Sequence, residues 1–185
     1  MMHRADEPRP WSAPIEIPSP AGSVRLRPER EDDRAFRYRL FCDSRQPEFA
    51  LLLPPAAYQQ VMAHQFHAQT VSYRAEFPQA RFDIVELAGR PIGRIVVDRP
   101  ATMLHIVDQA IIPELRGRGI GTAIMRALMD EAAALRLPVR LKVASSNDPS
   151  MRLYLRLGFV PVESVALYIE LEWQPGACSD DTITR

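Results

Sequence analysis

Apolar residues recur every three or four positions in two long segments, which is the spacing of a helix that buries one face. The stronger pattern predicts a helix over residues 122–136. The weaker one predicts a helix over residues 56–76, which begins after Pro54 and Pro55. In the first helix the expected buried positions are Ile120, Ala123, Ile124, Ala127, Leu128 and Leu135. In the second they are Tyr58, Met62, Phe66 and Tyr73.

Two shorter helices are predicted from the residues at their ends. Residues 29–39 begin with acids and end with arginines, which suits the helix dipole, and Phe36 and Leu40 would face inward. We expect the charges of this run to lie on a solvated helix face. A short helix should begin at Pro149 behind a capping Asn147 or Asp148 and end at Gly158.

Strands are predicted where apolar residues alternate or run together between turn residues. The segments 82–88 and 92–98 flank a Gly-Arg-Pro turn and should form a hairpin, while 103–112 is apolar on both faces and should lie at the centre of a sheet. The remaining strand candidates are 24–27, 139–144, 159–162 and 165–173. The pattern predicts an irregular lead-in over 1–21, one mixed α/β domain over 22–173, and a polar tail over 174–185.

The composition is that of a globular protein, with 46% hydrophobic and 25% charged residues in a chain of 185. The 23 basic residues balance the 23 acidic ones, which argues against a nucleic-acid-binding surface. The chain has no apolar run of ~18 residues, and its proline-rich start does not resemble a secretory signal, so we expect no membrane association.

The cysteines and histidines change this picture little. Cys42 and Cys178 lie far apart, we do not expect them to form a disulfide, and two free thiols suit the reducing cytoplasm. His64 and His67 have a spacing that can bind metal, but no third ligand with suitable spacing stands nearby. We therefore expect no metal and place both histidines in solvent or at the rim of a substrate site.

The segment 111–122 carries the clearest chemistry. The central strand runs into a loop with Gly117, Gly119 and Gly121, and the loop runs directly into a helix. Glycines let a ligand approach the main chain, and the first amides of a helix have no internal partners, so the loop predicts a phosphate or pyrophosphate site. Arg116 and Arg118 add positive charge. The loop lacks the Gly-Lys-Ser/Thr of a nucleotide P-loop and does not satisfy Gly-x-Gly-x-x-Gly, and a plain tight turn is the alternative.

The run 116–122, Arg-Gly-Arg-Gly-Ile-Gly-Thr, resembles the acyl-CoA pyrophosphate loop of the GNAT acyltransferases. Asn147 followed by Tyr154-x-x-x-Gly158-Phe159 resembles the second signature of that family. The resemblance is specific from about residue 103 to 159. It implies a single GNAT-like domain with a mostly antiparallel sheet, splayed at its middle strands and covered by helices on both faces. The central strand and the next one should be parallel.

The resemblance also implies which residues hold acetyl-CoA, without a metal. Ala110 and Ile112, with Ile111 between them, would offer main-chain groups to the pantetheine arm. The main-chain amides of Arg116, Gly117, Arg118, Gly119, Ile120, Gly121 and Thr122 would hold the pyrophosphate. Asn147 is either a ligand contact or only the helix cap.

Two residues are the candidates for catalysis. Tyr154 would protonate the departing thiolate, unless it is a core tyrosine whose hydroxyl is satisfied within the protein. Asp108 lies on an apolar strand, on the side shared by Ile106 and Ala110, so it is either the base or a carboxylate held by arginine. The alternative bases are Glu86 and Asp98. His105, on the other face of the Asp108 strand, is expected to be structural.

The implied reaction is the transfer of an acetyl or other short acyl group from acyl-CoA to a primary amine, by direct attack in a ternary complex. A non-catalytic acyl-CoA-binding or sensing module is the alternative. An accessory domain is a third hypothesis, to which an exposed patch around residues 51–53 would point. The acceptor cleft should lie within residues 36–77, whose aromatic residues favour a small or amphipathic amine or a peptide. The sequence leaves open whether the protein forms a homodimer.

Overall fold

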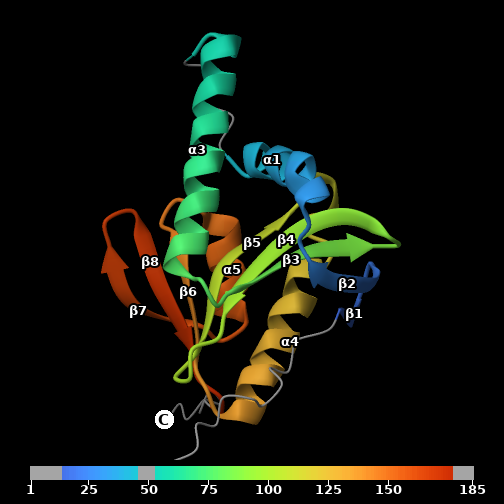
Figure 1. The fold of residues 1–185 in the computed structure, drawn as a ribbon. Coiled ribbons are helices and arrows are strands. Elements are labelled where there is room, and N and C mark those ends of the chain that lie inside the picture. The colour runs from blue at the N-terminus through green and yellow to red at the C-terminus, as the bar shows by residue number, and fades with distance from the viewer. Residues whose placement is uncertain (1–13, 46–52, 177–185) are drawn as a thin grey trace, which may run out of the picture.

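A single eight-stranded sheet forms the centre of the molecule (Figure 1). The computed structural model describes residues 14–45 and 53–176. The strand order is β1-β2-β3-β4-β5-β6-β8-β7, and every pair is antiparallel except β5 and β6. The strands are β1 (Ile15–Ser19), β2 (Gly22–Pro28), β3 (Arg81–Leu87), β4 (Arg90–Asp98), β5 (Leu104–Ile111), β6 (Val139–Ala144), β7 (Val160–Val165) and β8 (Tyr168–Trp173). This is the predicted mixed fold with one parallel pair at its centre.

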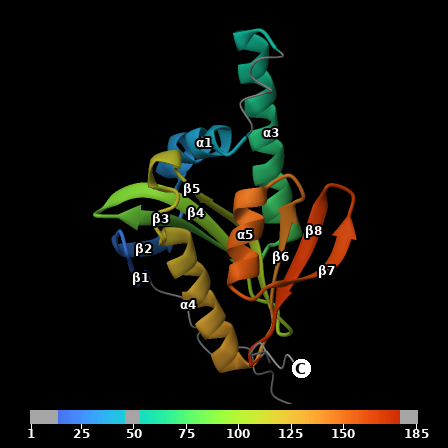
Figure 2. The same ribbon diagram turned by 180° about the vertical axis from the view of Figure 1, so that it is seen from behind.

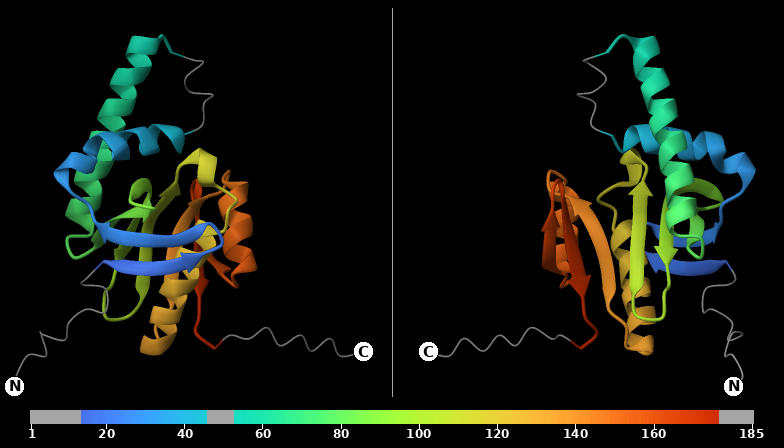
Figure 3. Two further views of the ribbon diagram at one scale, coloured as in Figure 1. Left: turned by 90° about the vertical axis from the view of Figure 1, so that its right-hand side faces the viewer. Right: turned by 60° about the vertical axis from the view of Figure 1, so that its left-hand side comes forward.

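Helices cover both faces of the sheet, as predicted. One face carries α1 (Arg34–Asp43) and α3 (Pro55–Glu76), and the other carries α4 (Ile120–Leu135) and α5 (Asp148–Arg156) (Figures 2 and 3). The 3-10 turns Glu31–Asp33 and Pro113–Leu115 precede α1 and follow β5. The end of α3 that begins at Pro55 projects beyond the sheet (Figure 1). No helix among the described residues is long and apolar enough to cross a membrane.

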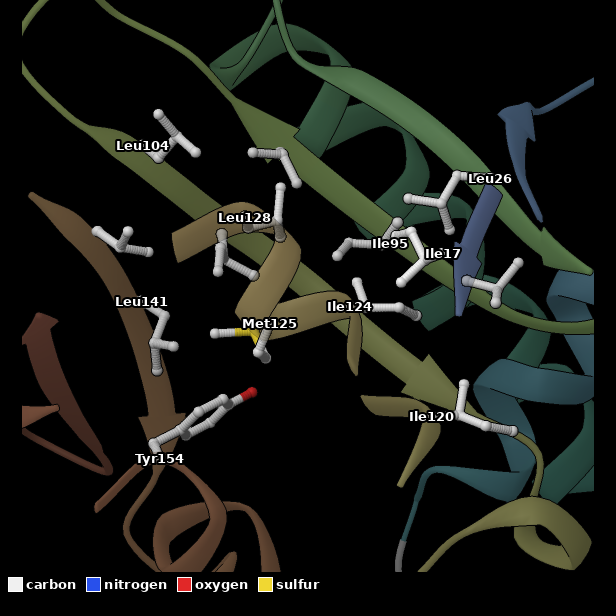
Figure 4. Close-up of a cluster of buried hydrophobic side chains, with 14 of the residues drawn as sticks. Ile17, Leu26, Ile95, Leu104, Ile120, Ile124, Met125, Leu128, Leu141 and Tyr154 are labelled. Atoms are coloured by element: carbon white, nitrogen blue, oxygen red, sulfur yellow. The ribbon is translucent and has the colours of Figure 1, made fainter. Parts of the chain in front are cut away.

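The main core lies between the sheet and the α4 and α5 face (Figure 4). Ile124, Met125 and Leu128 of α4 are almost fully buried against Ile95 and Leu104 of the sheet. Burying such side chains contributes roughly 2 kcal/mol each, so this face fixes α4 and the loop before it. The prediction for Leu135 was wrong, because it lies in the last turn of α4 and is 50% exposed.

The predicted splay is visible in the strand register. β5 pairs with β6 only through residues 104–106 of β5 and 139–141 of β6. Beyond these pairs the two strands separate, although β5 remains paired with β4 up to Ile111 and β6 remains paired with β8 up to Ala144. The sheet therefore has an internal gap at its centre, lined by residues 107–111 on one side.

The N-terminal segment corrects one prediction. Residues 15–19, expected to be irregular, form β1 at the sheet edge and pair with residues 22–26 of β2. The alternation of Ile15 and Ile17 was the available signal, and the prolines concealed it. Pro18 is tolerated here because an edge strand needs hydrogen-bond donors on one side only.

A β-bulge in β5 corrects a second prediction. Val97 pairs with Ile106 and Val96 pairs with Asp108, so Val107 has no partner in β4. A bulge of this kind re-aims the following side chains. Asp108 therefore faces away from the α4 core that contains Ile106, toward the face covered by α1 and α3. His105 contacts Phe77 at the end of α3, with ring centroids 5.2 Å apart, and shares the face of Asp108.

Candidate active site

The glycine loop ends at the first turn of α4. Gly117 and Gly119 have φ of 71° and 80°, and the Gly119 backbone also approaches Pro20, so both positions favour glycine. Within the described part of the chain, none of the amides from Gly117 to Thr122 donates a hydrogen bond to another main-chain group. These amides and the helix dipole form the kind of site that binds a phosphate.

The two loop arginines have different roles. The Arg116 amide donates to the Pro113 carbonyl at 3.2 Å, and its guanidinium donates to the carbonyls of Ile111 (2.9 Å) and Asp43 (3.2 Å). Arg116 therefore fastens the loop to β5 and to the end of α1. Arg118 is exposed beside a surface depression of about 560 Å³ that Pro20 and the loop glycines also border. Its charge is available to an anionic ligand.

The polar groups at the gap come from different strand residues than predicted. The Ile112 amide donates to the Ile92 carbonyl at 2.9 Å, and a Cβ placed on Gly93 would lie 2.5 Å from the Ala110 carbonyl oxygen. Ala110 and Ile112 therefore direct main-chain groups toward β4. Because successive residues of a strand point these groups in opposite directions, Gln109 and Ile111 present theirs to the gap. Of the three strand residues predicted, Ile111 is the one whose main chain points to the gap, and its carbonyl already accepts from Arg116 at 2.9 Å.

Asn147 caps α5. Its Oδ1 accepts the Ser150 amide at 3.3 Å, and Pro149 occupies the first turn, as expected for a helix start. Gly158 follows the end of α5 with φ of 88°. Asn147 also lines the central cleft, so capping and ligand contact are compatible at this position.

Tyr154 stands on the buried face of α5. Its ring contacts Phe159, with centroids 5.8 Å apart, and reaches toward Met125 of α4 (Figure 4). Its hydroxyl has no hydrogen-bond partner among the described residues, and Tyr154 lines the central cleft. Burial, together with the charge of Asp108, raises the pKa of Tyr154 to about 12. The phenol is therefore protonated at neutral pH and able to donate.

The central cleft has a volume of about 290 Å³ and continues from the gap between β5 and β6 toward α1 and α3. Among the described residues it brings together side chains from seven helices and strands, namely α1, α3, α5, β4, β5, β6 and β8. Those used below are Arg37, Tyr73, Arg94, Asp108, Asn147 and Tyr154. The predicted acceptor region contributes Phe41, Phe66 and Tyr73 to it, whereas residues 51 and 52 lie outside the described residues and Leu53 is 37% exposed.

Asp108 is paired. Its Oδ2 accepts from Arg94 Nη1 at 3.2 Å, and 26% of its side chain is exposed to the cleft. Burial by the surrounding cleft wall raises the pKa of this carboxyl above its usual value, and Arg94 opposes that shift. The arginine partner weakens the case for Asp108 as the base, as the sequence argument anticipated, yet it is the one candidate carboxylate that lines the cleft.

The alternative bases lie elsewhere. Glu86 is buried against Arg27 Nε at 2.6 Å, and Arg27 also binds Asp33 at 2.7 and 2.8 Å. Neither Glu86 nor Asp98 lines the cleft.

The acidic run at the start of residues 29–39 is not wholly solvated, contrary to the prediction, because Asp33 is only 7% exposed. The same holds for Glu29, whose side chain is 4% exposed and which contacts three arginines.

Tyr73 is a cleft residue to which the sequence argument gave only a lining role. Gln69 Nε2 donates to its hydroxyl at 3.2 Å, and burial and the Asp108 charge raise its pKa to about 12. The Asp108 carboxylate thus contributes to the raised pKa of two tyrosines, Tyr73 on α3 and Tyr154 on α5.

Among the described residues, no three of the His, Cys, Asp and Glu side chains come together as a metal site.

The residues present fit coenzyme A. The loop offers unpartnered amides for a diphosphate, and the gap offers strand groups of Gln109 and Ile111 for an extended amide-bearing arm. The end of that gap meets the hydroxyl of Tyr154, where the thiol of such a ligand would lie.

Comparisons with known proteins agree with this fit. The model of the acetyltransferase (GNAT) family matches residues 41–159. An N-alpha-acetyltransferase of Sulfurisphaera tokodaii is 30% identical over 104 residues, which are 49% of this chain and 62% of that protein. An L-2,4-diaminobutyric acid acetyltransferase of Nocardia farcinica is 29% identical over 149 residues, which cover 78% of this chain and 68% of that protein. The chain thus spans less than two thirds of the first of these relatives.

A solved structure shows the same fold. The PaiA N-acetyltransferase of Thermoplasma acidophilum in complex with coenzyme A superposes with a TM-score of 0.63 at 16% identity, covering 82% of this chain and 99% of that one. The family match covers more than half of the chain. The protein therefore belongs to the acetyltransferase (GNAT) family, whose members transfer acyl groups from acyl-CoA.

Proposed function

We propose that this protein transfers an acetyl group from acetyl-CoA to a primary amine by direct attack of the amine within a ternary complex. The observation that carries the proposal is the order of three features. The gap beside β5 leads along the chain into the loop whose amides from Gly117 to Thr122 have no main-chain partner, and the unpartnered hydroxyl of Tyr154 belongs to the cleft that residues 106–110 of β5 also line. Bound acetyl-CoA would supply an activated thioester beside Tyr154.

The residues of the loop and of β5 bind and orient the donor. Amides of residues 117–122 hold the diphosphate, and the main-chain groups of Gln109 and Ile111 hold the arm. Tyr154 donates a proton to the sulfur as the carbon–sulfur bond breaks, since its raised pKa keeps the phenol protonated at neutral pH. The hydroxyl has no partner within the described residues and belongs to a residue that lines the cleft, so it can reach the sulfur of a bound donor.

Asp108 removes the proton of the attacking amine. The amine must be neutral to form the new carbon–nitrogen bond, and the raised pKa of Asp108 makes this carboxylate a better base than an ordinary aspartate. Arg94 holds the carboxylate at the cleft wall. The proton passes directly or through one water, and no covalent enzyme intermediate is needed.

The acceptor is a small amine or the end of a peptide. The cleft of about 290 Å³ suits a molecule of amino-acid size. The names of the relatives, an N-alpha-acetyltransferase and a diaminobutyric acid acetyltransferase, support both kinds of acceptor.

The test is release of free CoA from acetyl-CoA with a panel of amines, amino acids, aminoglycosides and peptides. Turnover above the rate of acetyl-CoA hydrolysis with at least one amine is expected. Tight binding of acetyl-CoA without turnover of any amine would contradict the proposal and favour the non-catalytic acyl-CoA module.

A further inference from the structure

The end of the cleft beside α1 and α3 holds a cluster of arginines with too few acids. Glu29, whose side chain is 4% exposed, accepts from Arg37 at 3.3 Å, from Arg94 at 3.3 Å, and also from Arg74. One buried carboxylate therefore forms ion pairs with three guanidinium groups. These contacts fasten β4, α1 and α3 to one another behind the cleft wall.

Asp108 supplies the second negative charge, through its 3.2 Å contact with Arg94. A fourth guanidinium, that of Arg45 just past α1, stacks over the Phe41 ring at 4.4 Å and also lines the cleft. Arg37, Arg74 and Arg94 thus share the carboxylates of Glu29 and Asp108, and the positive charge of Arg45 also acts on Asp108. The contacts of Arg37 and Arg94 are longer than the roughly 2.8 Å usual for charge-assisted hydrogen bonds, as expected for shared partners.

Two buried donors of this cluster have no partner. Nη2 of Arg94 and Nε of Arg37 are inaccessible to water and donate to no atom of the described chain. The Arg94 side chain is 7% exposed and that of Arg37 is 10% exposed, and both line the cleft. A buried donor left unpaired costs about 1–3 kcal/mol, so a carboxylate that reached either guanidinium from the cleft would recover part of that free energy.

The surroundings of Arg37 disfavour its charged form. Burial is the main cause that lowers the pKa of its guanidinium, the positive charges of Arg94 and Arg74 act in the same direction, and Glu29 and Asp33 oppose the shift. A carboxylate bound beside Arg37 would favour the charged form.

We propose that this arginine cluster binds a carboxylate of the acceptor, so that the substrate of the acetyl transfer is an amino acid or another small amine with a carboxylate. The inference rests on the function proposed above and adds the substrate class. Planar guanidinium groups match a carboxylate bidentately. With the carboxylate at Arg37 and Arg94, the amine of the same molecule lies toward Asp108 and Tyr154 in a cleft of about 290 Å³.

The arginines of the cleft disfavour the opposite class of acceptor. Polyamines and aminoglycosides carry several positive charges, and placing them beside Arg37, Arg45 and Arg94 would cost electrostatic energy in a poorly hydrated cleft. The cluster therefore sets specificity by repulsion as well as by attraction.

The experiment compares amines that differ only in the carboxylate. The pairs are L-2,4-diaminobutyrate and 1,3-diaminopropane, L-ornithine and putrescine, L-methionine and 3-(methylthio)propylamine, and L-phenylalanine and phenethylamine. CoA release gives kcat and KM for each. We expect the carboxylated member of at least one pair to have a kcat/KM about 10- to 100-fold higher, the range that charged hydrogen bonds provide.

Substitutions of single arginines test whether the arginine cluster causes the preference for carboxylated amines. Arg37→Gln should raise KM for the carboxylated substrate by about tenfold or more and leave its decarboxylated analogue unchanged, so that the preference disappears. Arg45→Gln, at an exposed arginine, should act in the same direction if Arg37→Gln does not fold. Arg39→Gln is the matched control, because Arg39 is exposed on the same helix and does not line the cleft.

A binding measurement shows whether this inference about the acceptor fails or whether the proposed acetyl transfer itself fails. The CoA-saturated protein is titrated calorimetrically with the N-acetylated form of each member of a pair. Affinity that depends on the carboxylate and is lost in Arg37→Gln supports the inference even where no amine turns over. Equal or better use of the decarboxylated amines overturns it while acetyl transfer stands. If neither turnover nor binding depends on the carboxylate, the inference is also overturned.

Discussion

Two tyrosines and one aspartate show how the surroundings of a side chain decide its chemistry. On a regular strand Asp108 would share the face of Ile106 toward the α4 core, but the bulge at Val107 turns it toward the cleft and against Arg94. Burial, with the charge of Asp108 as the second cause, raises the pKa of Tyr73 and of Tyr154 to about 12. The pH range over which the Tyr154 phenol stays protonated is thereby extended upward.

Replacing Tyr154 with phenylalanine tests the role of the hydroxyl alone. Phenylalanine keeps the ring contact with Phe159, so the variant should fold like the wild type. Loss of the proton donor should lower kcat by about 100-fold, and the affinity for CoA should change little. Steady-state kinetics and calorimetry measure the two effects, with Tyr58→Phe, outside the cleft, as the control. A loss of CoA affinity as large as the loss of kcat would indicate a binding role instead.

The pH dependence of kcat tests Asp108. The base acts when deprotonated, so activity should fall as the pH decreases through the pKa of Asp108. Because burial raises that pKa, the fall should begin at a higher pH than for an exposed aspartate, whose pKa is about 3.9. Tyr154, with a pKa of about 12, should produce no loss of kcat between pH 7 and pH 10. Asp108→Asn should lower kcat, and an unchanged acid limb in the residual activity would assign that limb to another group.

At the scale of elements, the glycine loop does two things at once. It reverses the chain between β5 and α4, and it leaves the first amides of α4 without partners. Either requirement alone could be met by other residues, but φ of 71° and 80° at Gly117 and Gly119 places both in the region that favours glycine. Arg116 then keeps the loop in place through two carbonyl oxygens.

A pair of glycine-to-alanine variants separates the two functions of the loop. Gly117 and Gly89 have φ of 71° and 74°, and a Cβ at either position would meet no atom within 4 Å. Both Gly117→Ala and Gly89→Ala should therefore cost about 1 kcal/mol of stability from backbone strain, measured by urea denaturation. Only Gly117→Ala should weaken CoA binding, by about tenfold, because its loop alone holds the diphosphate. Equal CoA affinity in the two variants would contradict the loop assignment.

The elements of the fold could be predicted largely from local signals. The glycine loop, the hairpin around Gly89 and the cap at Asn147 each depend on a few neighbouring residues, and the structure has all three. The bulge at Val107 could not be predicted, because it depends on how β4 pairs with β5. It moved Asp108 to the face opposite Ile106, so Asp108 and His105 share one face instead of lying on opposite faces as predicted. Asp108 nevertheless lines the central cleft, because the bulge turns its side chain toward the face on which that cleft lies.

Contacts between distant residues mark the limit of sequence reasoning at the scale of the whole molecule. Glu29 lies in a charged run that suggests a solvated helix, yet it binds Arg74 and Arg94 from elements much later in the chain. No local pattern distinguishes a buried glutamate from an exposed one in such a run. The acceptor end of the cleft is built from these long-range contacts, so its arginine cluster became visible only in the fold, whereas the donor end follows from one contiguous loop.

The whole sheet is held together across its centre by few strand contacts, since β5 and β6 pair through three residues each. The rest of the connection between the two halves passes through α4, α5 and the core beneath them. A ligand arm lying in the gap would supply the missing hydrogen bonds and join the halves. Binding should therefore stabilise the protein by about 2.7 kcal/mol at a CoA concentration of 100 times Kd, and thermal unfolding measures this gain.

Amide hydrogen exchange shows where that stabilisation arises. The Ile112 amide donates to Ile92 in β4 and, by the alternation of the strand, the Ala110 amide also points to β4. Both should be protected from exchange without CoA. The amides of Gln109 and Ile111 face the gap, so they should exchange rapidly in the free protein and slow by at least about tenfold when CoA saturates it. Ala110 and Ile112 are the internal controls on the same strand. Protection that rises equally at all four amides would mean that CoA rigidifies the domain as a whole, and protection of Gln109 and Ile111 already present without CoA would show that the gap is closed by the protein itself.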